Sequence, residues 1–155
     1  IVDRDADGRH FSLLAKKAQN SLLEKCFDEK SNFFFDVYSN EEKRTSSKTI
    51  KGLMPLLLDI DQTLAEKLVK EHLTNKSEFG LIYPLPTVAA DDPDFKAQPP
   101  TILGEPIIWR GPTWINTNWY LVRGLREHGF EDEAEKIVTD VPNRKALEIV
   151  KKKYE

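Results

Sequence analysis

The chain has 155 residues, a formal net charge of −3 and a charged fraction of 32%. This length is ordinary for one domain with a buried core, and the charge balance gives no electrostatic attraction for nucleic acid or for an anionic membrane. Its one cysteine, Cys26, cannot form an internal disulfide, and no apolar run is long enough to span a bilayer. The lack of a signal peptide favours a cytoplasmic location, and the lack of an initiator methionine leads us to expect a piece of a longer protein.

Three segments in the first half of the chain have apolar residues at helical spacing. Their bounds are 10–27, 47–59 and 61–74. The first and third are amphipathic, and the third starts at a capping residue, either Asp59 or Asp61. The second is apolar over most of its circumference, which indicates a helix buried on more than one face, and Pro55 should kink it or mark a late start.

Two further helices are predicted at 113–128 and 131–139. The first has Pro112 beside its first turn and Gly129 at its end, which is the usual asymmetry of helix termini. The second is acidic in its first turn, as the helix dipole favours. A last helical segment, 143–155, closes the chain.

The helices alternate in character, because an apolar helix is twice followed by an amphipathic one after a short turn. These two pairs are 47–59 with 61–74 and 113–128 with 131–139. Such pairs form helical hairpins, and hairpins stacked around an axis form an α/α toroid whose loops at one end carry a site. We therefore predict a single all-α domain over residues 1–155. A plain helical bundle would contain the same helices but would not need the long loops at 28–45 and 79–108.

All three tryptophans fall in "EPIIWRGPTWINTNW", residues 105–119. An indole stacks on the apolar face of a sugar ring while Arg, Asn and Asp side chains bind its hydroxyls, so this composition indicates a carbohydrate site. We expect Trp109 and Arg110 to point at the site. Trp114 and Asn118 are four residues apart and should share one face of the following helix.

Other residues of this segment have structural explanations. Gly111 should let the backbone approach closely. Trp119 falls on a different helix face from Trp114 and is expected to be a core anchor. The alternative to the sugar site is that Trp114 is also a core residue and that Arg110 pairs with a structural carboxylate such as Asp92.

Carboxylates occupy two further candidate positions. In "AADDPDF", Asp91 and Asp94 are expected to cap turns, because Asp-Pro sequences favour turn initiation. For Asp92, a turn cap and a hydrogen bond to sugar hydroxyls or to Arg110 remain equally open. Asp36 lies between aromatic residues in "FFFDVY" and is either a paired structural residue or a site residue.

No metal site and no cofactor are predicted. The segment "DRDADG", residues 3–8, imitates the start of a calcium-binding loop, but Leu14 stands where the bidentate glutamate is required. The histidines are scattered without ligand spacing, and a single cysteine gives no basis for a zinc site.

The segments "PTVAADDPDF" and "WRGPTWINTNWYLVRGLREHGFEDEA" together closely resemble the C-terminal part of glycoside hydrolase family 63. The resemblance begins near Phe11 and is strongest from Pro86 to Ala134. It implies a catalytic domain that is an (α/α)6 toroid, in which "WRGP-x-W" precedes an inner helix. "FFFDVYS" resembles the aromatic-Asp segment of an earlier loop in the family, which favours Asp36 as a site residue.

The resemblance also implies an inverting α-glycosidase. In such enzymes one acid protonates the leaving oxygen and one base activates a water across the ring, with about 6.5–9.5 Å between the two carboxyl groups. The family's general acid lies upstream, in a segment that this chain does not contain. Its general base is a glutamate in an aromatic-Glu motif just beyond the last helix, which makes Glu155 in "KKKYE" a candidate base. Glu155 is equally well explained as a solvated terminal residue.

Three functional hypotheses remain open. The first is a fragment of a glycosidase for α-glucosides or α-mannosides, of the oligosaccharide or glycosylglycerate type, whose partners are a carbohydrate and the missing part of the toroid as a second chain. The fragment alone should be inactive. The second is a non-catalytic carbohydrate-binding helical module, and the third is a helical interaction scaffold with core tryptophans. Under the toroid hypothesis, Asp36 and Trp109 should lie at the same end of the helices.

Overall fold

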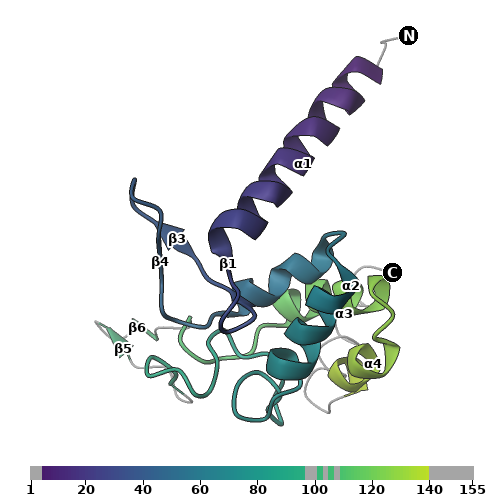
Figure 1. The fold of residues 1–155 in the computed structure, drawn as a ribbon. Coiled ribbons are helices and arrows are strands. Elements are labelled where there is room, and N and C mark those ends of the chain that lie inside the picture. Colours follow the sequence, from purple (N-terminus) through teal and green to yellow (C-terminus); the bar gives the residue numbers. More distant parts are fainter. Residues whose placement is uncertain (1–4, 97–100, 103–104, 107–108, 140–155) are drawn as a thin grey trace.

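A computed structural model describes residues 5–96, 101–102, 105–106 and 109–139 (Figure 1). Helices form about half of this part of the chain. They are α1 (Asp5–Cys26), η1 (Ile50–Leu57), α2 (Gln62–Lys67), η2 (Leu68–Leu73), α3 (Ile115–Glu127) and α4 (Glu131–Thr139). The predicted helix at 143–155 lies outside the described residues, and so does the candidate base Glu155.

Three short antiparallel strand pairs lie in the loops between the helices. They are β1 (Phe27–Asp28) with β2 (Phe33–Phe34), β3 (Val37–Tyr38) with β4 (Lys43–Arg44), and β5 (Thr101–Ile102) with β6 (Glu105–Pro106). The prediction of an all-α chain is therefore right for the body and wrong for these loops. The strand β2 forms because Phe33 and Phe34 are buried in the core, at 0% and 4% exposure, and their backbone groups need partners there.

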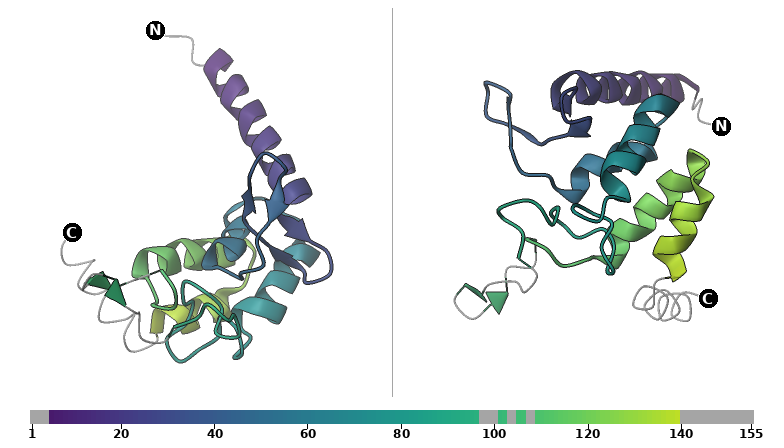
Figure 2. Two further views of the ribbon diagram at one scale, coloured as in Figure 1. Left: turned by 90° about the vertical axis from the view of Figure 1, so that its left-hand side faces the viewer. Right: turned by 60° about the horizontal axis from the view of Figure 1, so that its bottom comes forward.

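The first helix, α1, projects away from the rest of the described chain (Figures 1 and 2). Leu22, Leu23 and Cys26 at its C-terminal end pack against the core. Phe11 and Leu14, nearer its N-terminus, are 66% and 48% exposed. The predicted helix is thus confirmed, but most of its apolar face remains exposed in this chain.

The helices η1 and α3 lie side by side and run in the same direction. At their N-terminal ends, Ile50 N donates to Thr87 O at 2.9 Å, and Thr87 N donates to Pro112 O at 3.2 Å. At their C-terminal ends, His128 Nε2 lies 3.0 Å from Leu58 O. Because both pairs of like ends are joined, the two helices are parallel, which is the relation expected of neighbouring inner helices in an α/α toroid.

Local chemistry explains the form and the close approach of these helices. Pro55 has no amide hydrogen and lies inside η1, which is a 3-10 helix rather than the kinked α-helix expected from the sequence. Gly52 leaves room for the ring of Phe33, since a Cβ there would lie 2.3 Å from Phe33 Cε1. A Cβ at Gly124 would likewise lie 2.6 Å from Leu56 O.

Helix α2 starts shortly after the C-terminal end of η1, and α4 starts shortly after the C-terminal end of α3. Asp61 caps α2, because its Oδ1 accepts Thr63 N at 2.9 Å and Leu64 N at 3.3 Å, and η2 continues α2 as a π-helix. Gly129, at a φ of 79°, lets the chain turn from α3 into α4. The predicted pairing of α3 with α4 is confirmed. The main neighbour of η1 is α3, so η1 and α2 pair less extensively than predicted.

One hydrophobic core joins these elements. Its fully buried members come from β2, η1, α2, η2, α3, α4 and the loop at 79–89. The largest are Phe33, Phe79, Leu53, Leu56, Leu68, Leu85, Leu121 and Leu125. None of the helices in the described part of the chain is long and apolar enough to cross a bilayer.

Candidate functional site

The loop end of the parallel helices brings the candidate residues together. Asp36 forms an ion pair with Lys51 at the start of η1. Gly111 N donates to Thr87 Oγ1 at 2.8 Å, and Thr87 O in turn accepts the N–H of the first η1 residue. Asp36 and the segment before Gly111, with Trp109 and Arg110, therefore lie at the same end of η1 and α3, as the toroid hypothesis requires.

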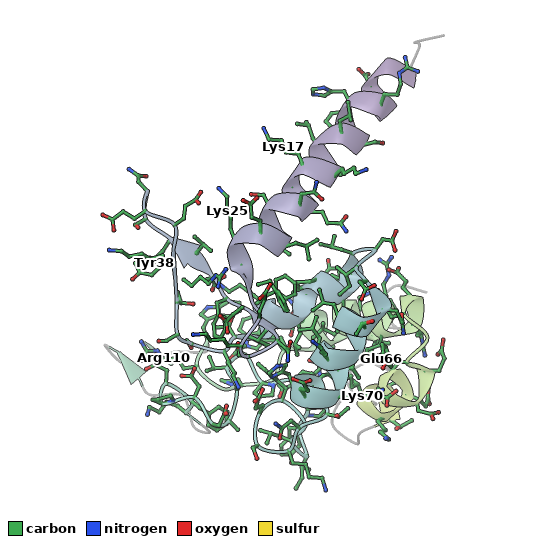
Figure 3. The ribbon with its side chains drawn as sticks, viewed as in Figure 1. Lys17, Lys25, Tyr38, Glu66, Lys70 and Arg110 are labelled. Atoms are coloured by element: carbon green, nitrogen blue, oxygen red, sulfur yellow. The ribbon has the colours of Figure 1, made fainter. Side chains whose placement is uncertain are left out.

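Figure 3 shows the position of this end on the molecule. Arg110 lies on the side of the body that the loops form, far from Glu66 on α2 and Lys70 on η2 (Figure 3). Long loops on a helical scaffold are where binding residues are commonly found.

Two of the tryptophans form a stacked pair. The rings of Trp109 and Trp114 have centroids 4.1 Å apart and planes inclined by 16°. Trp109 is 59% exposed and Trp114 is half-buried, so the pair presents an aromatic surface to solvent with Trp109 outermost. An exposed indole face is a platform on which the C–H face of a sugar ring can stack.

The position of Trp114 differs from the prediction. Trp114 is the N-cap residue of α3 and has extended backbone angles, so it precedes the helix that contains Asn118. The reason is an isolated bridge between Pro86 and Thr113, which holds the backbone before α3 extended. Asn118 is buried against the same loop, where its Nδ2 donates to Pro84 O at 3.4 Å.

Asn118 has an unusual environment for a polar side chain. It is 3% exposed, and its Oδ1 has no hydrogen-bond partner among the described residues. Buried carbonyl oxygens of this kind are normally paired, so Asn118 has spare acceptor capacity beside the loop end.

Arg110 is held by two groups of the preceding loop. Its Nη1 lies 3.6 Å from Asp94 Oδ1, and both side chains are about half-exposed or more, at 49% and 60%. Its carbonyl oxygen accepts Lys96 N at 2.6 Å. Gly111 makes this approach possible, because its φ is 149° and a Cβ would lie 2.1 Å from Lys96 O. The close approach at Gly111 is confirmed. Arg110 also pairs with a carboxylate, as the alternative to the sugar site held, but the partner is Asp94 and not Asp92.

Asp92 organises the loop through backbone groups. Its Oδ1 accepts Asp94 N and its Oδ2 accepts Lys48 N, each at 2.9 Å. Both carboxylate oxygens therefore already have donors, and Asp92 caps its turn, which is one of the two roles left open by the sequence. Whether Asp92 also contacts a sugar stays a prediction.

Asp36 is 38% exposed, with Lys51 as its ion-pair partner. Its negative charge also acts on Cys26, at the end of α1. Burial raises the pKa of the Cys26 thiol above its ordinary value, and the charge of Asp36 raises it further. Asp36 is thus paired with Lys51 but still accessible to solvent, so a sugar could reach its carboxylate.

The expectation that Trp119 is a core anchor is not met in the described chain. It is 50% exposed, and the neighbouring Tyr120 is 49% exposed, so Trp119 is not a core anchor within the described chain. The residues of α3 that face η1 are apolar and smaller, with Leu121 and Leu125 fully buried. Trp119 lies on another side of α3, and half of its surface is exposed. The hypothesis of a scaffold with core tryptophans is therefore wrong for this structure.

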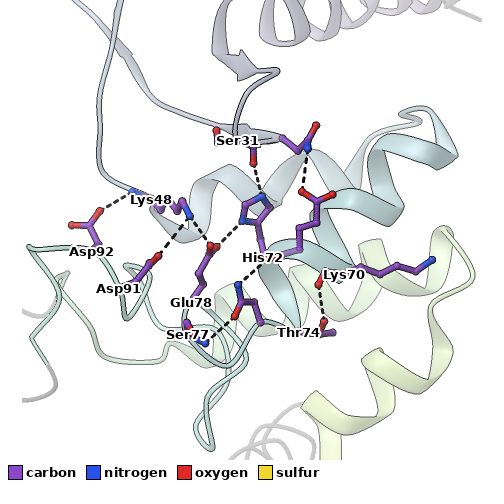
Figure 4. A network of polar contacts seen from close by, with 12 residues as sticks. Ser31, Lys48, Lys70, His72, Thr74, Ser77, Glu78, Asp91 and Asp92 are labelled. Atoms are coloured by element: carbon purple, nitrogen blue, oxygen red, sulfur yellow. Dashed lines mark hydrogen bonds and ion pairs between the residues drawn. The ribbon is translucent and has the colours of Figure 1, made fainter.

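A buried polar network next to this loop end was not predicted (Figure 4). His72 Nδ1 lies 2.6 Å from Glu78 Oε2, and Lys48 Nζ lies 2.6 Å from Glu78 Oε1. His72 and Glu78 have side-chain exposures of only 5% and 8%. No sequence signal pointed to this network, because His72 falls on the apolar face of its helix and Glu78 follows in a polar turn.

The described residues contain no group of three or more histidine, cysteine, aspartate or glutamate side chains arranged to hold a metal ion. The segment 3–8, which imitates a calcium loop, lies partly outside the described residues, and Gly8 falls within α1.

The chain matches a family model over residues 1–148, that of the mannosylglycerate hydrolase MGH1-like glycoside hydrolase domain. It is 30% identical over 120 residues to a mannosylglycerate hydrolase of Thermus thermophilus, a match that covers 76% of this chain and 26% of that protein. A segment of 29 residues is 55% identical to the mannosylglycerate hydrolase of Rubrobacter radiotolerans and covers 19% of this chain and 7% of that protein.

Solved structures that resemble this chain include glycoside hydrolases as well. A GH63 mannosylglycerate hydrolase from Thermus thermophilus in complex with glucose superposes with a TM-score of 0.63 at 29% identity, covering 76% of this chain and 26% of that one. Neutral trehalase from Saccharomyces cerevisiae superposes with a TM-score of 0.60 at 22% identity, covering 79% of this chain and 21% of that one, which shows a shared fold. The fold is thus one that glycoside hydrolases use.

The chain belongs to the mannosylglycerate hydrolase MGH1-like glycoside hydrolase family, within glycoside hydrolase family 63. It spans about a quarter of the length of the Thermus relatives that it matches, at 26% in each case.

Proposed function

We propose that this chain is a C-terminal part of the catalytic domain of an inverting α-glycosidase, built as an (α/α)6 toroid. Its substrates are α-glucosides or α-mannosides of the oligosaccharide or glycosylglycerate type. Family membership supports the glycosidase class, and the resemblance of the GH63 mannosylglycerate hydrolase from Thermus thermophilus, determined in complex with glucose, supports a sugar as the ligand.

The observation that carries this proposal is the aromatic and charged surface at the loop end. The stacked pair of Trp109 and Trp114 offers an exposed indole face, and Arg110 follows Trp109 directly in the chain. The guanidinium group donates up to five hydrogen bonds, and its salt link to Asp94 is exposed and therefore weak enough to exchange for sugar hydroxyls. A platform beside a fixed donor is what recognition of a pyranose ring requires.

The remaining candidate residues complete the proposed sugar-binding wall. Asp36 is accessible at the start of η1, and Asn118 has a spare acceptor oxygen one turn into α3. Asp92 contributes mainly by holding the turn that carries Asp94. Substrate contact by Asp36, Asn118 or Asp92 remains a proposal.

Catalysis needs groups that this surface does not supply. An inverting mechanism uses a general acid at the leaving oxygen and a general base on a water, about 6.5–9.5 Å apart. We assign the acid to a segment upstream of this chain and keep Glu155 as the candidate base. The described residues then bind and orient the sugar, while bond cleavage depends on the complete enzyme.

Exposed apolar residues indicate where the remainder of the toroid would pack. Phe11 and Leu14 on α1 and Trp119 and Tyr120 on α3 are each between 48% and 66% exposed. In a closed toroid a further inner helix would lie against the open side of α3. We therefore expect the isolated chain to associate with a complementary chain or with itself.

A non-catalytic carbohydrate-binding module is the second candidate function. It uses the same surface of Trp109, Trp114 and Arg110 and needs neither acid nor base. The exposed tryptophan pair favours it over a helical scaffold, and hydrolysis by the complete protein separates it from the first candidate.

The two functions are tested with the 155-residue chain and with the complete parent protein. Titration with glucose, mannose and their α-glycosides should quench or shift the tryptophan fluorescence, since all three tryptophans lie in one short segment. The complete protein should hydrolyse an α-glucoside or α-mannoside with inversion, and the isolated chain should not. Turnover by the isolated chain, freed of contaminating enzyme, would overturn this assignment of roles. Sugar binding without hydrolysis by the complete protein would favour the binding module.

A further inference from the structure

We propose that Lys48 is a positioning residue for the sugar-binding arginine, Arg110. This inference rests on the proposed function, because it assumes that Arg110 binds substrate. Lys48 links the buried network of His72 and Glu78 to the turn at 92–96, and that turn holds Arg110.

The anchor of the network is the pair of His72 and Glu78 (Figure 4). His72 Nε2 lies 2.8 Å from Ser31 O, and a carbonyl oxygen only accepts, so Nε2 donates in this contact. His72 Nδ1 lies 2.6 Å from Glu78 Oε2, and this second contact also contains a proton because the two atoms are within hydrogen-bond distance. The imidazole is therefore fixed at both nitrogens, and it fixes the carboxylate of Glu78 in turn.

Lys48 connects Glu78 to the loop at 89–92 through three groups: its ammonium group, its N–H and its carbonyl oxygen. Its Nζ lies 2.6 Å from Glu78 Oε1 and 3.7 Å from Asp91 Oδ2. Its N–H donates to Asp92 Oδ2 at 2.9 Å, and its carbonyl oxygen accepts Ala89 N at 2.8 Å. The side chain of Lys48 is 23% exposed, so its ammonium group is largely withdrawn from water and depends on these carboxylates.

The turn at 92–96 completes the link to Arg110. Asp92 Oδ1 accepts Asp94 N at 2.9 Å, which fixes the backbone of the turn at Asp94. Asp94 pairs with the guanidinium group of Arg110, and Lys96 N donates to the Arg110 carbonyl oxygen at 2.6 Å. The backbone of Arg110 is thus held by a turn whose first residue is bonded to Lys48, and Asp94 of the same turn lies beside the guanidinium group.

Loss of the Lys48 ammonium group should therefore act on the site without touching the substrate. Glu78 would keep its contact with His72 but lose the ammonium group at its Oε1, and a buried carboxylate that loses such a partner forces its surroundings to rearrange. The segment that leads from Lys48 and Glu78 into the turn would shift. A displacement of about 1 Å at a binding group can cost on the order of 100-fold in rate.

The test uses the complete enzyme and three variants of single lysines. Lys48→Met should lower kcat/KM for the α-glycoside by at least about 10-fold. Lys48→Arg keeps the cation and should recover most of that loss. Lys70→Met is the matched control, because Lys70 has the same kind of carboxylate partner, Glu66, at 2.8 Å but lies exposed on η2. It should leave kcat/KM unchanged.

A double-mutant cycle separates positioning from general destabilisation. If Lys48 acts through Arg110, Lys48→Met should have little further effect in an Arg110→Ala enzyme, since the group that it positions is already gone. Circular dichroism should show that each variant is folded at the assay temperature. If Lys48→Met is not folded there, Glu78→Gln replaces it in the same cycle, with the same expected result.

Each outcome decides the question. A folded Lys48→Met enzyme with less than about a 10-fold loss, or a full loss that persists beside Arg110→Ala, overturns the role of Lys48 and leaves the proposed function intact. Wild-type kinetics of the Arg110→Ala single variant would instead overturn the proposed function, and the role of Lys48 with it.

Discussion

Gly124 of α3 packs directly against the carbonyl oxygen of Leu56 in η1, to which a Cβ at that position would come within 2.6 Å. This contact is between a glycine and rigid backbone, so neither side can yield by rotating a side chain. It sets the spacing of the two parallel helices, and those helices place the loop end with Trp109 and Arg110.

Gly124→Ala should therefore destabilise the fold. Overpacking of this kind typically costs about 1–3 kcal/mol, although alanine has the better helix propensity. Chemical denaturation followed by circular dichroism measures the free energy of unfolding. The control is Gly8→Ala in α1, where a Cβ meets nothing within 4 Å. Gly8→Ala should be neutral or stabilising by up to about 1 kcal/mol. Equal stability of the two variants would show that the helices are not packed as described.

Trp109→Ala should weaken substrate binding in the complete enzyme. Trp109 is the exposed member of the stacked pair, and aromatic stacking contributes about 0.5–1.5 kcal/mol, which corresponds to a rise in KM of about 2- to 13-fold. Steady-state kinetics give KM and kcat separately. Trp119→Phe is the comparison and should leave KM unchanged. This substitution keeps an aromatic ring, and Trp119 lies within α3, outside the stacked pair of Trp109 and Trp114. A KM raised by Trp119→Phe and unchanged by Trp109→Ala would place the sugar elsewhere.

Cys26 should report the charge of Asp36. Because burial and then the Asp36 carboxylate raise the pKa of the thiol, little reactive thiolate is present at neutral pH, and alkylation by iodoacetamide should be slower than for free cysteine. Asp36→Asn removes the second cause and should move the pH–rate profile to lower pH. Glu66→Gln, an exposed carboxylate on α2, should leave the profile where it is. An unmoved profile in Asp36→Asn would mean that the two groups are not neighbours.

Asp28 gives the chain an acid-dependent contribution to stability. The hydroxyl of Ser31 and then its N–H donate to Asp28 Oδ2, which holds the pKa of that carboxyl below its usual value of 3.8. A depressed pKa in the folded state adds stability that is present above the unfolded-state pKa and is lost as the pH falls through the folded-state value. The free energy of unfolding should therefore fall below about pH 4, and less steeply in Asp28→Asn. Parallel curves for the two proteins between about pH 2 and 5 would contradict this role.

Local rules predicted the parts of the fold that depend on neighbours in the sequence. The end of α3 at Gly129 and the close approach at Gly111 each follow from one residue and its backbone requirement. The cap at Asp61 is one of the two positions that the sequence offered, the other being Asp59. The apolar periodicity of segments 61–74 and 113–128 also located the helices within a few residues.

Features that depend on distant contacts were not predictable in this way. Trp114 remains outside α3 because of a backbone bridge between Pro86 and Thr113, which are 27 positions apart in the numbering. The exposure of Trp119 depends on which element covers the open side of α3, and periodicity cannot supply that information.

The buried network of Lys48, His72 and Glu78 is the clearest example of a feature that the sequence did not predict. Lys48, His72 and Glu78 come from three separate segments, and none has a motif that marks it as buried. Burial of such a set is unfavourable unless every charge is paired, so only the folded arrangement reveals it. The candidate sugar site, in contrast, was found because its tryptophans and arginine are adjacent in sequence.

Substrate binding by Arg110 at the loop end is tested by the kinetics of Arg110→Ala in the complete enzyme. Loss of charge-assisted hydrogen bonds costs about 1.5–3 kcal/mol, so kcat/KM for an α-glucoside or α-mannoside should fall by about 10- to 150-fold. The control is Arg126→Ala, since Arg126 lies at the other end of α3 and pairs with Glu131 and Glu135 at 3.4 and 3.8 Å. Wild-type kcat/KM in Arg110→Ala, or an equal loss in Arg126→Ala, would contradict substrate binding by Arg110.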